Sequence, residues 1–205
     1  MNAMLELTNI HKTFNKGTIN EKTCAPGRDL TLKNQDFVTV IGGNGAGKST
    51  TLNAIAGVWP VDEGIITIDG ENITGYPEYK RARLLGRVFQ DPMTGTASTM
   101  SIEENMAIAA RRGHRRGLRW GISRKEREEF KKKLAALGLG LEERISTKVG
   151  LLSGGQRQAV TLLMAAIKKP KLLLLDEHTA ALDPKTAKKV LEISDKIIEE
   201  NQLTA

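Results

Sequence analysis

The segment Gly42–Ser49 constrains the fold of this chain more than any other feature. It reads Gly-Gly-Asn-Gly-Ala-Gly-Lys-Ser and fits the pattern G-x-x-x-x-G-K-[ST] in full. The apolar run Phe37–Ile41 before it predicts a strand, and the pattern Ser49–Gly57 after it predicts a helix. A strand that turns through glycines directly into a helix is a building unit of α/β folds. We therefore expect an α/β domain built around this turn.

The residues of this segment suit the binding of phosphate groups. Glycines allow the backbone to wrap closely enough to point its N–H groups at a phosphate. We expect Lys48 to place its ammonium between the β- and γ-phosphates of a nucleotide, Ser49 to offer its hydroxyl to Mg²⁺, and Thr50 to reach the α-phosphate. The rest of the predicted nucleotide-binding loop is Gly42, Gly43, Asn44, Gly45, Ala46 and Gly47. A glycine-rich turn without a ligand is the alternative, which the flanking strand and helix disfavour.

Short apolar runs rich in β-branched residues alternate with helical patterns along the rest of the chain. This alternation predicts a mainly parallel sheet flanked by helices. Further strands are predicted at Met4–Leu7, Ile65–Ile68, Arg87–Phe89 and Leu172–Leu175. Further helices are predicted at Ile102–Arg111, Ser123–Leu137, Gly154–Ile167 and Pro184–Glu200, the last with Asp183 as its N-cap.

Between Asp91 and Gly150 the strand pattern disappears and charged helical segments take over. We predict a core of residues 1–92 and 150–205, with a helical subdomain of residues 93–149 inserted in it. The subdomain contains the basic cluster Arg111–Arg116, followed by Arg119 and Trp120. A solvated loop and helix end is the favoured interpretation of this cluster. Contact with membrane headgroups or a partner protein is the alternative, and nucleic-acid binding is not expected because a single tryptophan is a poor stacking platform.

Two acidic residues, Asp176 and Glu177, follow the apolar run Leu172–Leu175. Ligands of α/β sheets bind at the carboxyl ends of the strands. We therefore expect Asp176 to hold Mg²⁺ and Glu177 to be the base that polarises an attacking water. Gln90 ends another predicted strand, and its amide is a candidate contact for Mg²⁺ or for that water. The alternatives are an exposed acid and a surface glutamine at strand ends.

A second phosphate-facing element has the sequence Leu152-Ser153-Gly154-Gly155-Gln156. A serine and two glycines at the start of a helix offer a hydroxyl and free N–H groups to an anion, and the helix dipole favours negative charge there. The pentapeptide contains neither a lysine for a phosphate nor a carboxylate for a metal. One set of catalytic groups with two phosphate-facing elements indicates a nucleotide shared between two copies of the chain.

The bulk composition limits the remaining possibilities. With 205 residues, 40% of them hydrophobic, the chain is long enough to bury the core of one α/β domain. The net charge of +7 permits an acidic partner without choosing one. A single cysteine, Cys24, excludes an intramolecular disulfide framework and fits a reducing compartment. No apolar run approaches the roughly 18 residues of a membrane span, so we expect any membrane role to act through a partner.

Five segments occur in a characteristic order, and together they resemble the ATPase subunits of ATP-binding cassette (ABC) transporters. The segments are Gly42–Ser49, Phe89–Pro92, Leu152–Gln158, Leu175–Glu177 and Ala181–Asp183. The resemblance runs from Met4 to the C-terminus. More narrowly, the chain is similar to subunits of bacterial importers and to those of a tryptophan/tyrosine uptake group. The resemblance to these ATPase subunits implies a P-loop NTPase core with an N-terminal antiparallel β portion. It also implies that the chain hydrolyses ATP with Mg²⁺.

The resemblance assigns further roles. Phe14 matches the aromatic residue that stacks on adenine, with a core or edge phenylalanine as the alternative. Ser153, Gly154, Gly155 and Gln156 would contact the nucleotide bound to a second, head-to-tail copy. The helical subdomain and the loop after Gln90 would receive a membrane-spanning permease subunit at the cytoplasmic face of the membrane. An extracytoplasmic solute-binding protein would belong to the same import system.

Two departures from the family pattern stand out. His178 occupies a position that is usually proline, and we expect it to be structural, pointing away from Glu177. The family's switch histidine lies roughly 30 residues past the catalytic glutamate, whereas this sequence ends at Ala205. We therefore expect a C-terminally truncated ATPase, without the last strands, that binds nucleotide and is impaired as a catalyst.

Other classes of function fit the sequence less well. Relatives that act in DNA repair, chromosome structure or translation carry a long coiled-coil insertion or a second cassette. Here the segment between Gln90 and Ser153 is short, and the chain has one P-loop. A nonfunctional fragment is the remaining alternative.

Overall fold

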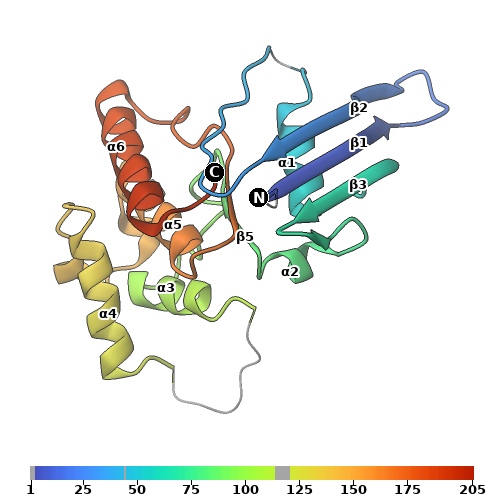
Figure 1. The fold of residues 1–205 in the computed structure, drawn as a ribbon. Coiled ribbons are helices and arrows are strands. Elements are labelled where there is room, and N and C mark those ends of the chain that lie inside the picture. Colours follow the sequence, from blue (N-terminus) through green and yellow to red (C-terminus); the bar gives the residue numbers. More distant parts are fainter. Residues whose placement is uncertain (1–2, 44, 114–120) are drawn as a thin grey trace. The chain divides into compact units, whose positions relative to one another are not determined.

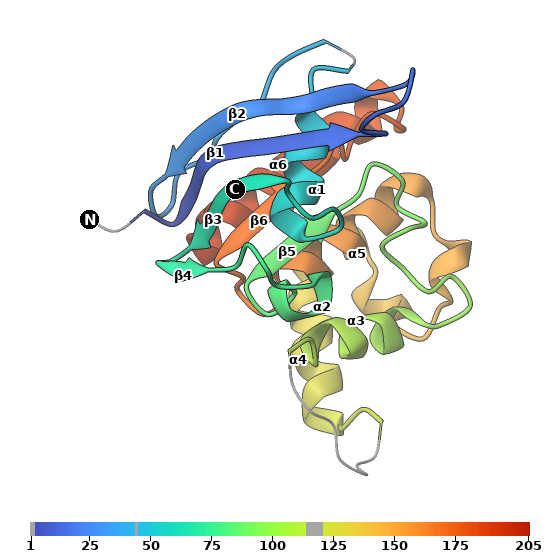
Figure 2. The same cartoon turned by 90° about the vertical axis from the view of Figure 1, so that its right-hand side faces the viewer.

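The computed structural model describes residues 3–43, 45–113 and 121–205. The chain divides into two compact units. The first comprises Met1–Gly86, Lys171–Leu174 and Gln202–Ala205, and the second comprises Arg87–Pro170 and Leu175–Asn201. Figures 1 and 2 show the elements of both units in two views. The predicted domain boundaries at residues 93 and 149 stay a prediction.

The first unit contains a four-stranded antiparallel sheet in the order β2-β1-β3-β4. Its strands are β1 (Leu5–Phe14), β2 (Lys22–Leu32), β3 (Glu63–Ile68) and β4 (Glu71–Asn72). Leu5 lies opposite Leu32 on one side and Ile68 on the other, so β1 is the central strand of the three longest. The side chains of these three residues are buried. The expected N-terminal antiparallel portion is therefore confirmed.

Helix α1 (Lys48–Ala56) ends at a buried arginine from the short helix α2 (Glu78–Arg81). The Arg81 guanidinium donates to the carbonyls of Ala54 and Ile55 at 2.7 and 2.9 Å. These carbonyls belong to the last turn of α1, where partners within the helix run out, and the Ala54 carbonyl also accepts from the Gly57 N–H at 3.2 Å. Gly57 follows in the left-handed region, and a Cβ there would lie 2.7 Å from Arg81 Nε. Arg81 thus fixes the end of the helix that begins at the glycine-rich loop.

The predicted strand Phe37–Ile41 is wrong, because these residues form no regular strand in the structure. The Phe37 side chain is 57% exposed and that of Ile41 is 90% exposed. Val38 donates its N–H to the carbonyl of Ala205, at 2.9 Å. Apolar and β-branched residues favour extended backbone, but a strand also needs a continuous ladder of hydrogen bonds with a neighbour.

Strands β5 (Leu85–Val88) and β6 (Leu172–Leu175) form a second, parallel sheet. The carbonyl of Leu84 accepts from the Lys171 N–H at 2.8 Å, and that of Val88 accepts from the Asp176 N–H at 3.1 Å. The two strands therefore run in the same direction. Leu172, Leu173 and Leu174 are buried, as predicted for a central strand.

The second unit is mainly helical. Its helices are α3 (Ile102–Ala110), α4 (Arg124–Ala135), α5 (Gly154–Ala166) and α6 (Pro184–Asn201), with short 3₁₀ turns at Glu142–Arg144 and Val149–Leu151. All four predicted helices of this region are confirmed to within two residues at each end. Asp183 accepts from the Thr186 N–H at 3.1 Å, which confirms it as the N-cap of α6. Hydrogen bonds from the Thr186 side chain and backbone hold the pKa of Asp183 below its usual range.

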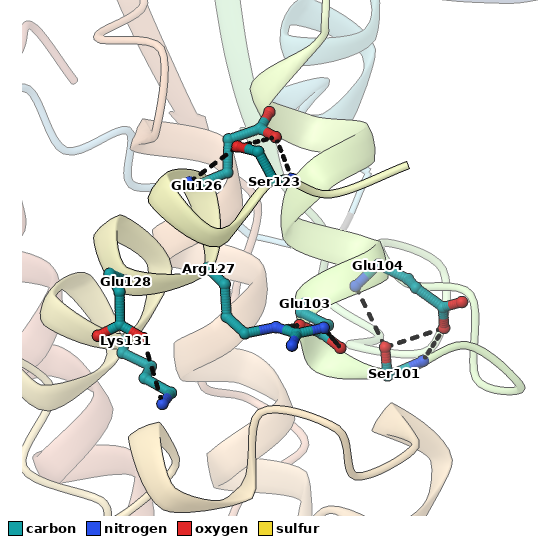
Figure 3. Close-up of polar contacts among 8 residues, drawn as sticks. All are labelled: Ser101, Glu103, Glu104, Ser123, Glu126, Arg127, Glu128 and Lys131. Atoms are coloured by element: carbon teal, nitrogen blue, oxygen red, sulfur yellow. Dashed lines mark hydrogen bonds and ion pairs between the residues drawn. The ribbon is translucent and has the colours of Figure 1, made fainter. Parts of the chain in front are cut away.

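Helices α3 and α4 begin with the same N-terminal capping motif (Figure 3). Ser101 accepts from the backbone N–H of Glu104, whose carboxylate accepts in return from the Ser101 N–H. Ser123 and Glu126 repeat this capping box at the start of α4. Each glutamate places negative charge against the positive end of its helix.

A partly buried ion pair joins the two helices. Arg127 Nε lies 2.6 Å from a carboxylate oxygen of Glu103, and its second nitrogen lies 3.1 Å from the other oxygen. Such a two-point contact fixes the relative orientation of both side chains. Figure 3 shows the pair lying between α3 and α4.

The described part of the basic cluster makes contacts within the second unit. Arg111 donates to the Ala107 carbonyl and pairs with Glu126, both at 3.0 Å. Arg112 donates to the carbonyl of Ala165 at 3.0 Å. The other predicted members, His114, Arg115, Arg116, Arg119 and Trp120, lie outside the described residues. Among the residues that the structure describes, no helix combines the length and hydropathy needed to cross a membrane.

Candidate functional site

The glycine-rich loop of the first unit turns directly into α1. Gly45 and Gly47 have φ of 80° and 83°, in the left-handed region that residues with a Cβ seldom adopt. Gly47 is the N-cap of α1, and its carbonyl accepts from both the N–H and the hydroxyl of Thr51 at 2.9 Å. The glycines thus allow the loop to enter the helix without a spacer residue.

Strand β2 supports this loop from the side. A Cβ at Gly47 would lie 2.1 Å from the Cys24 carbonyl, so the backbones approach too closely for any other residue. The Arg28 guanidinium donates to the Ala46 carbonyl. The Lys22 ammonium lies 3.3 Å from the position that a Cβ on Gly45 would take. Lys22 and Arg28 were not predicted as site residues, because no motif marks them.

The first turn of α1 carries the predicted phosphate-binding side chains. Lys48 Nζ donates to the carbonyl of Gly42 at 2.6 Å, so its ammonium lies against the loop. The Ser49 side chain is exposed, whereas Thr50 is buried. The first turn of α1 contains no acidic residue that would neutralise the positive end of the helix.

These features fit a polyphosphate ligand. The loop offers glycine N–H groups, the positive end of a helix, and the ammonium groups of Lys48 and Lys22. The predicted loop residues Gly42, Gly43, Gly45, Ala46 and Gly47 are described by the structure, and Asn44 lies outside the described residues. Their contacts with a nucleotide stay a prediction.

Phe14 is the last residue of β1 and is half-buried. Its ring meets that of Trp59 edge to face, with centroids 4.8 Å apart. The Lys12 ammonium lies 5.5 Å from the same ring. Trp59 therefore fixes the orientation of the ring that we predict to stack on adenine.

The predicted catalytic acids lie at the end of β6, in the second unit. Asp176 is half-buried, and one of its oxygens lies 3.9 Å from a guanidinium nitrogen of Arg87. Glu177 is exposed and has a φ of 44°, which is rare for a residue with a side chain. The strand end therefore turns sharply at Glu177.

Gln90 follows β5 and is exposed. The residue before it, Phe89, accepts at its carbonyl a 3.3 Å hydrogen bond from the Gln158 side chain. Gln158 is fully buried on α5. Helix α5 thus holds the backbone next to Gln90, a contact that the sequence pattern did not reveal.

Helix α5 begins at Ser153 with a third capping box. The Ser153 hydroxyl accepts from the Gln156 N–H at 3.3 Å, and the Gln156 amide oxygen accepts from the Ser153 N–H at 3.2 Å. The residue at the third helical position is neutral here, unlike Glu104 and Glu126 in α3 and α4. No acidic residue lies in the first turn. The positive end of α5 is therefore not neutralised by its own cap.

The start of α5 lines a pocket of about 390 Å³ within the second unit. It is lined by Ser153, Gly155 and Gln156, and also by Lys185 and Lys189 of α6. Gly155 is required by packing, because a Cβ there would lie 2.1 Å from Thr186 Cγ2. A pocket with two lysines and a helix start suits an anion.

Arg157 holds the segment before α5 in shape. Its guanidinium donates to the carbonyls of Val149, Gly150 and Leu152 at 3.1 to 3.2 Å. Arg157 lies within a predicted motif, but the pattern predicted no role for it. Its side chain fixes the turn that leads into Ser153.

Each unit contains one set of predicted residues. The first holds Phe14, the glycine-rich loop, Lys48, Ser49 and Thr50, and the second holds Gln90, Ser153–Gln156, Asp176 and Glu177. The predicted Mg²⁺ contacts, Ser49, Gln90 and Asp176, are divided between the units, and their assignment stays a prediction. In residues 3–43, 45–113 and 121–205, no group of three or more histidine, cysteine or acidic side chains is arranged to hold a metal ion.

Comparisons with known proteins agree on one family. The profile of the ABC transporter family matches residues 27–180. The tyrosine transport ATP-binding protein of Clostridioides difficile is 41% identical, over 98% of this chain and 80% of its own length. The spermidine/putrescine import ATP-binding protein PotA of Haemophilus influenzae is 38% identical, over 91% of this chain and 46% of its own length. The chain thus spans about half the length of this second relative.

A solved structure matches the fold. It is a dimeric, post-hydrolysis state of the ATP-binding cassette MJ0796 bound to ADP and Pi. The TM-score is 0.80 at 29% identity, and the match covers 98% of this chain and 85% of that chain. The P-loop NTPase fold expected from the sequence is therefore confirmed.

Proposed function

The chain belongs to the ABC transporter family of ATPases, and we propose that it drives the import of a small solute, an amino acid such as tyrosine, through a membrane permease. Its relatives in C. difficile and H. influenzae are named for transport of tyrosine and import of polyamines. The amino acid is favoured because the tyrosine transport protein matches over more of both chains.

The observation that carries this proposal is the start of α5. Its capping box contains a neutral glutamine instead of a glutamate, and it lies beside Lys185 and Lys189, so it suits a phosphate group. Yet the phosphate-binding lysine, Lys48, belongs to the other unit. We propose that Ser153, Gly154, Gly155 and Gln156 contact ATP held by a second, head-to-tail copy. The dimeric state of the matching cassette MJ0796 supports this arrangement.

Hydrolysis of ATP in such a dimer needs positioning and charge neutralisation more than covalent chemistry. The loop N–H groups and Lys48 would neutralise the charge that develops on the transferred phosphoryl group. Glu177 would polarise the attacking water, and Gln90 would contact it. Mg²⁺, held by Ser49, Asp176 and Gln90, would supply further positive charge at the phosphates.

The partners follow from the same proposal. The chain would bind permease subunits at the cytoplasmic face of the membrane, through the helices of the second unit and the loop after Gln90. An extracytoplasmic solute-binding protein would deliver the solute to the permease. The C. difficile relative is named as a tyrosine transport ATP-binding protein, which supports a role in such a transport system.

The variant Glu177→Gln tests the catalytic part of the proposal. It removes the base but keeps the size of the side chain, so ATP should still bind while hydrolysis stops and the dimer accumulates. Fluorescent ATP binding, phosphate release and gel filtration with ATP measure these three properties. Lys48→Ala is the matched control, which should lose ATP binding itself. Normal phosphate release by Glu177→Gln would show that Glu177 is not the base.

A further inference from the structure

The turn that carries Glu177 is strained at one residue. Glu177 adopts a φ of 44°, where its Cβ crowds the following carbonyl oxygen. Its own carbonyl accepts from the Ala180 N–H at 2.9 Å, which closes a turn over residues 177–180. A strained conformation persists only where surrounding contacts hold it. The contacts of the next residue, His178, can maintain the strained conformation of Glu177.

His178 is buried, with 9% of its surface exposed. Its Nε2 lies 3.0 Å from the Oγ of Ser194 on α6, and that Oγ donates in turn to the Val190 carbonyl at 2.9 Å. A serine hydroxyl has one hydrogen. When that hydrogen goes to Val190, the tautomer of His178 that carries its hydrogen on Nε2 satisfies both contacts by donating to Ser194.

Ser194 lies on the buried face of α6, whose other buried residues include Val190, Ile193 and Ile197. The helix is 18 residues long. The acceptor of the His178 hydrogen bond is therefore part of a rigid, packed element. The residues on both sides of the strained Glu177 are anchored, since the Asp176 N–H donates to the Val88 carbonyl.

We propose that His178 is a positioning residue for hydrolysis, which holds the backbone of Glu177 in its left-handed turn by donating to Ser194 of α6. The inference rests on the proposed role of Glu177 as the base. His178 acts through the backbone and does not touch the nucleotide. Without its hydrogen bond, the turn relaxes and the Glu177 carboxylate loses its fixed direction.

Two variants remove the hydrogen bond from either side. His178→Leu removes the donor and keeps an apolar side chain, and Ser194→Ala removes the acceptor. We expect either change to lower kcat for ATP hydrolysis about tenfold while KM stays within about twofold, because ATP binding does not involve the turn. The double variant should hydrolyse ATP no more slowly than either single variant, because the two changes remove the same hydrogen bond.

Rescue separates positioning from a general loss of stability. His178→Gln keeps an N–H donor at a similar reach and should restore most of the lost kcat. Lys188 is exposed on α6, the helix that carries Ser194. Lys188→Ala is therefore the matched control and should leave kcat unchanged. Equal loss of activity in His178→Gln and His178→Leu would overturn the proposal.

Hydrogen exchange gives a readout that does not depend on catalysis. The Ala180 amide, which donates to the Glu177 carbonyl, should exchange faster in His178→Leu and Ser194→Ala, and at the normal rate in His178→Gln. Unchanged exchange overturns the proposal even if activity falls. Faster exchange with normal kcat also overturns it, provided that Glu177→Gln is inactive. If Glu177→Gln is active, the proposed base is wrong, and the exchange rate alone decides whether His178 holds the turn. If His178→Leu fails to fold, Ser194→Ala decides.

Discussion

At the scale of single residues, Gly155 shows how a motif position can be fixed by packing. A Cβ on Gly155 would lie 2.1 Å from Thr186 Cγ2, whereas a Cβ on Gly154 would meet only the Leu182 side chain, at 3.3 Å. We expect Gly155→Ala to lower the free energy of unfolding by about 1–3 kcal/mol, because α5 and α6 must separate. Urea denaturation measures this change.

Two matched variants check the cause. Gly154→Ala should be neutral or stabilising, because Leu182 can move and alanine favours a helix over glycine. Adding Thr186→Ser to Gly155→Ala removes the clashing methyl and should restore most of the loss. If the double variant were as unstable as Gly155→Ala alone, the packing explanation would be wrong.

Asp62 predicts a pH dependence of stability in the first unit. The Thr13 N–H and the Lys12 ammonium, at 2.6 and 3.0 Å, hold the pKa of this carboxyl below its usual range. A lowered pKa in the folded state adds stability above the usual value of about 3.9, and this stability is lost as the pH falls through the lowered value. The pair is partly exposed, so the contribution is below about 1 kcal/mol.

Comparison with Asp62→Asn isolates this contribution. The variant should be less stable than the natural chain at pH 7, and the gap should close as the pH falls below about 4. Urea denaturation at a series of pH values gives the gap directly. A gap that widens in acid would show that the carboxylate is not stabilised by these contacts.

At the scale of elements, the three capping boxes differ in charge. Helices α3 and α4 have glutamate at the third position, and α5 has Gln156. Gln156→Glu should keep the box and stabilise the folded chain by about 0.3–1 kcal/mol through the helix dipole. The same charge should weaken ATP-dependent association by about 1 kcal/mol, because it faces the phosphate proposed to bind there.

The opposite signs make this variant informative. Thermal unfolding should shift upward while the ATP concentration needed for dimerisation, measured by gel filtration, rises roughly fivefold. Gln202→Glu makes the same chemical change in the other unit and should leave association unchanged. An unaltered ATP requirement in Gln156→Glu would count against a phosphate at the start of α5.

Helices were predicted more accurately than strands, and the reason is physical. A helix such as Gly154–Ala166 satisfies its own backbone, so local periodicity and caps define it. A strand depends on distant partners, so Phe37–Ile41 was predicted in error and β2 was missed. Strand β2 contains Pro26 and Gly27, and its register against β1 shifts. No alternation of apolar residues marks it.

The candidate site divides in the same way. Motif spacing indicated Lys48, Asp176 and Glu177, because their chemistry requires fixed neighbours in sequence. Lys22 and Gln158 reach their positions only through the fold, Lys22 beside Gly45 and Gln158 at the Phe89 carbonyl. His178 was predicted to be structural, and its burial and its bond to Ser194 confirm that it is anchored in the fold.

At the scale of the whole molecule, the proposed site needs two copies of the chain. Lys48 belongs to the first unit and Ser153 to the second. In a head-to-tail dimer, each ATP would meet Lys48 of one copy and Ser153 of the other. Lys48→Ala and Ser153→Arg should therefore each abolish both sites of their own homodimer. A mixture of the two variants should form a heterodimer with one intact site.

This complementation separates a shared site from one contained within a single copy. Both variants would carry Glu177→Gln, so that ATP hydrolysis does not dissociate the dimer. Only the Lys48→Ala variant would carry an affinity tag. ATP should allow the tagged Lys48→Ala chain to capture the untagged Ser153→Arg chain, while neither variant captures an untagged copy of itself. The retained pair should hold one ATP, because its second site has lost both contributions. If each ATP were bound entirely by one copy, mixing would restore nothing, and the mixture would behave as the sum of its parts.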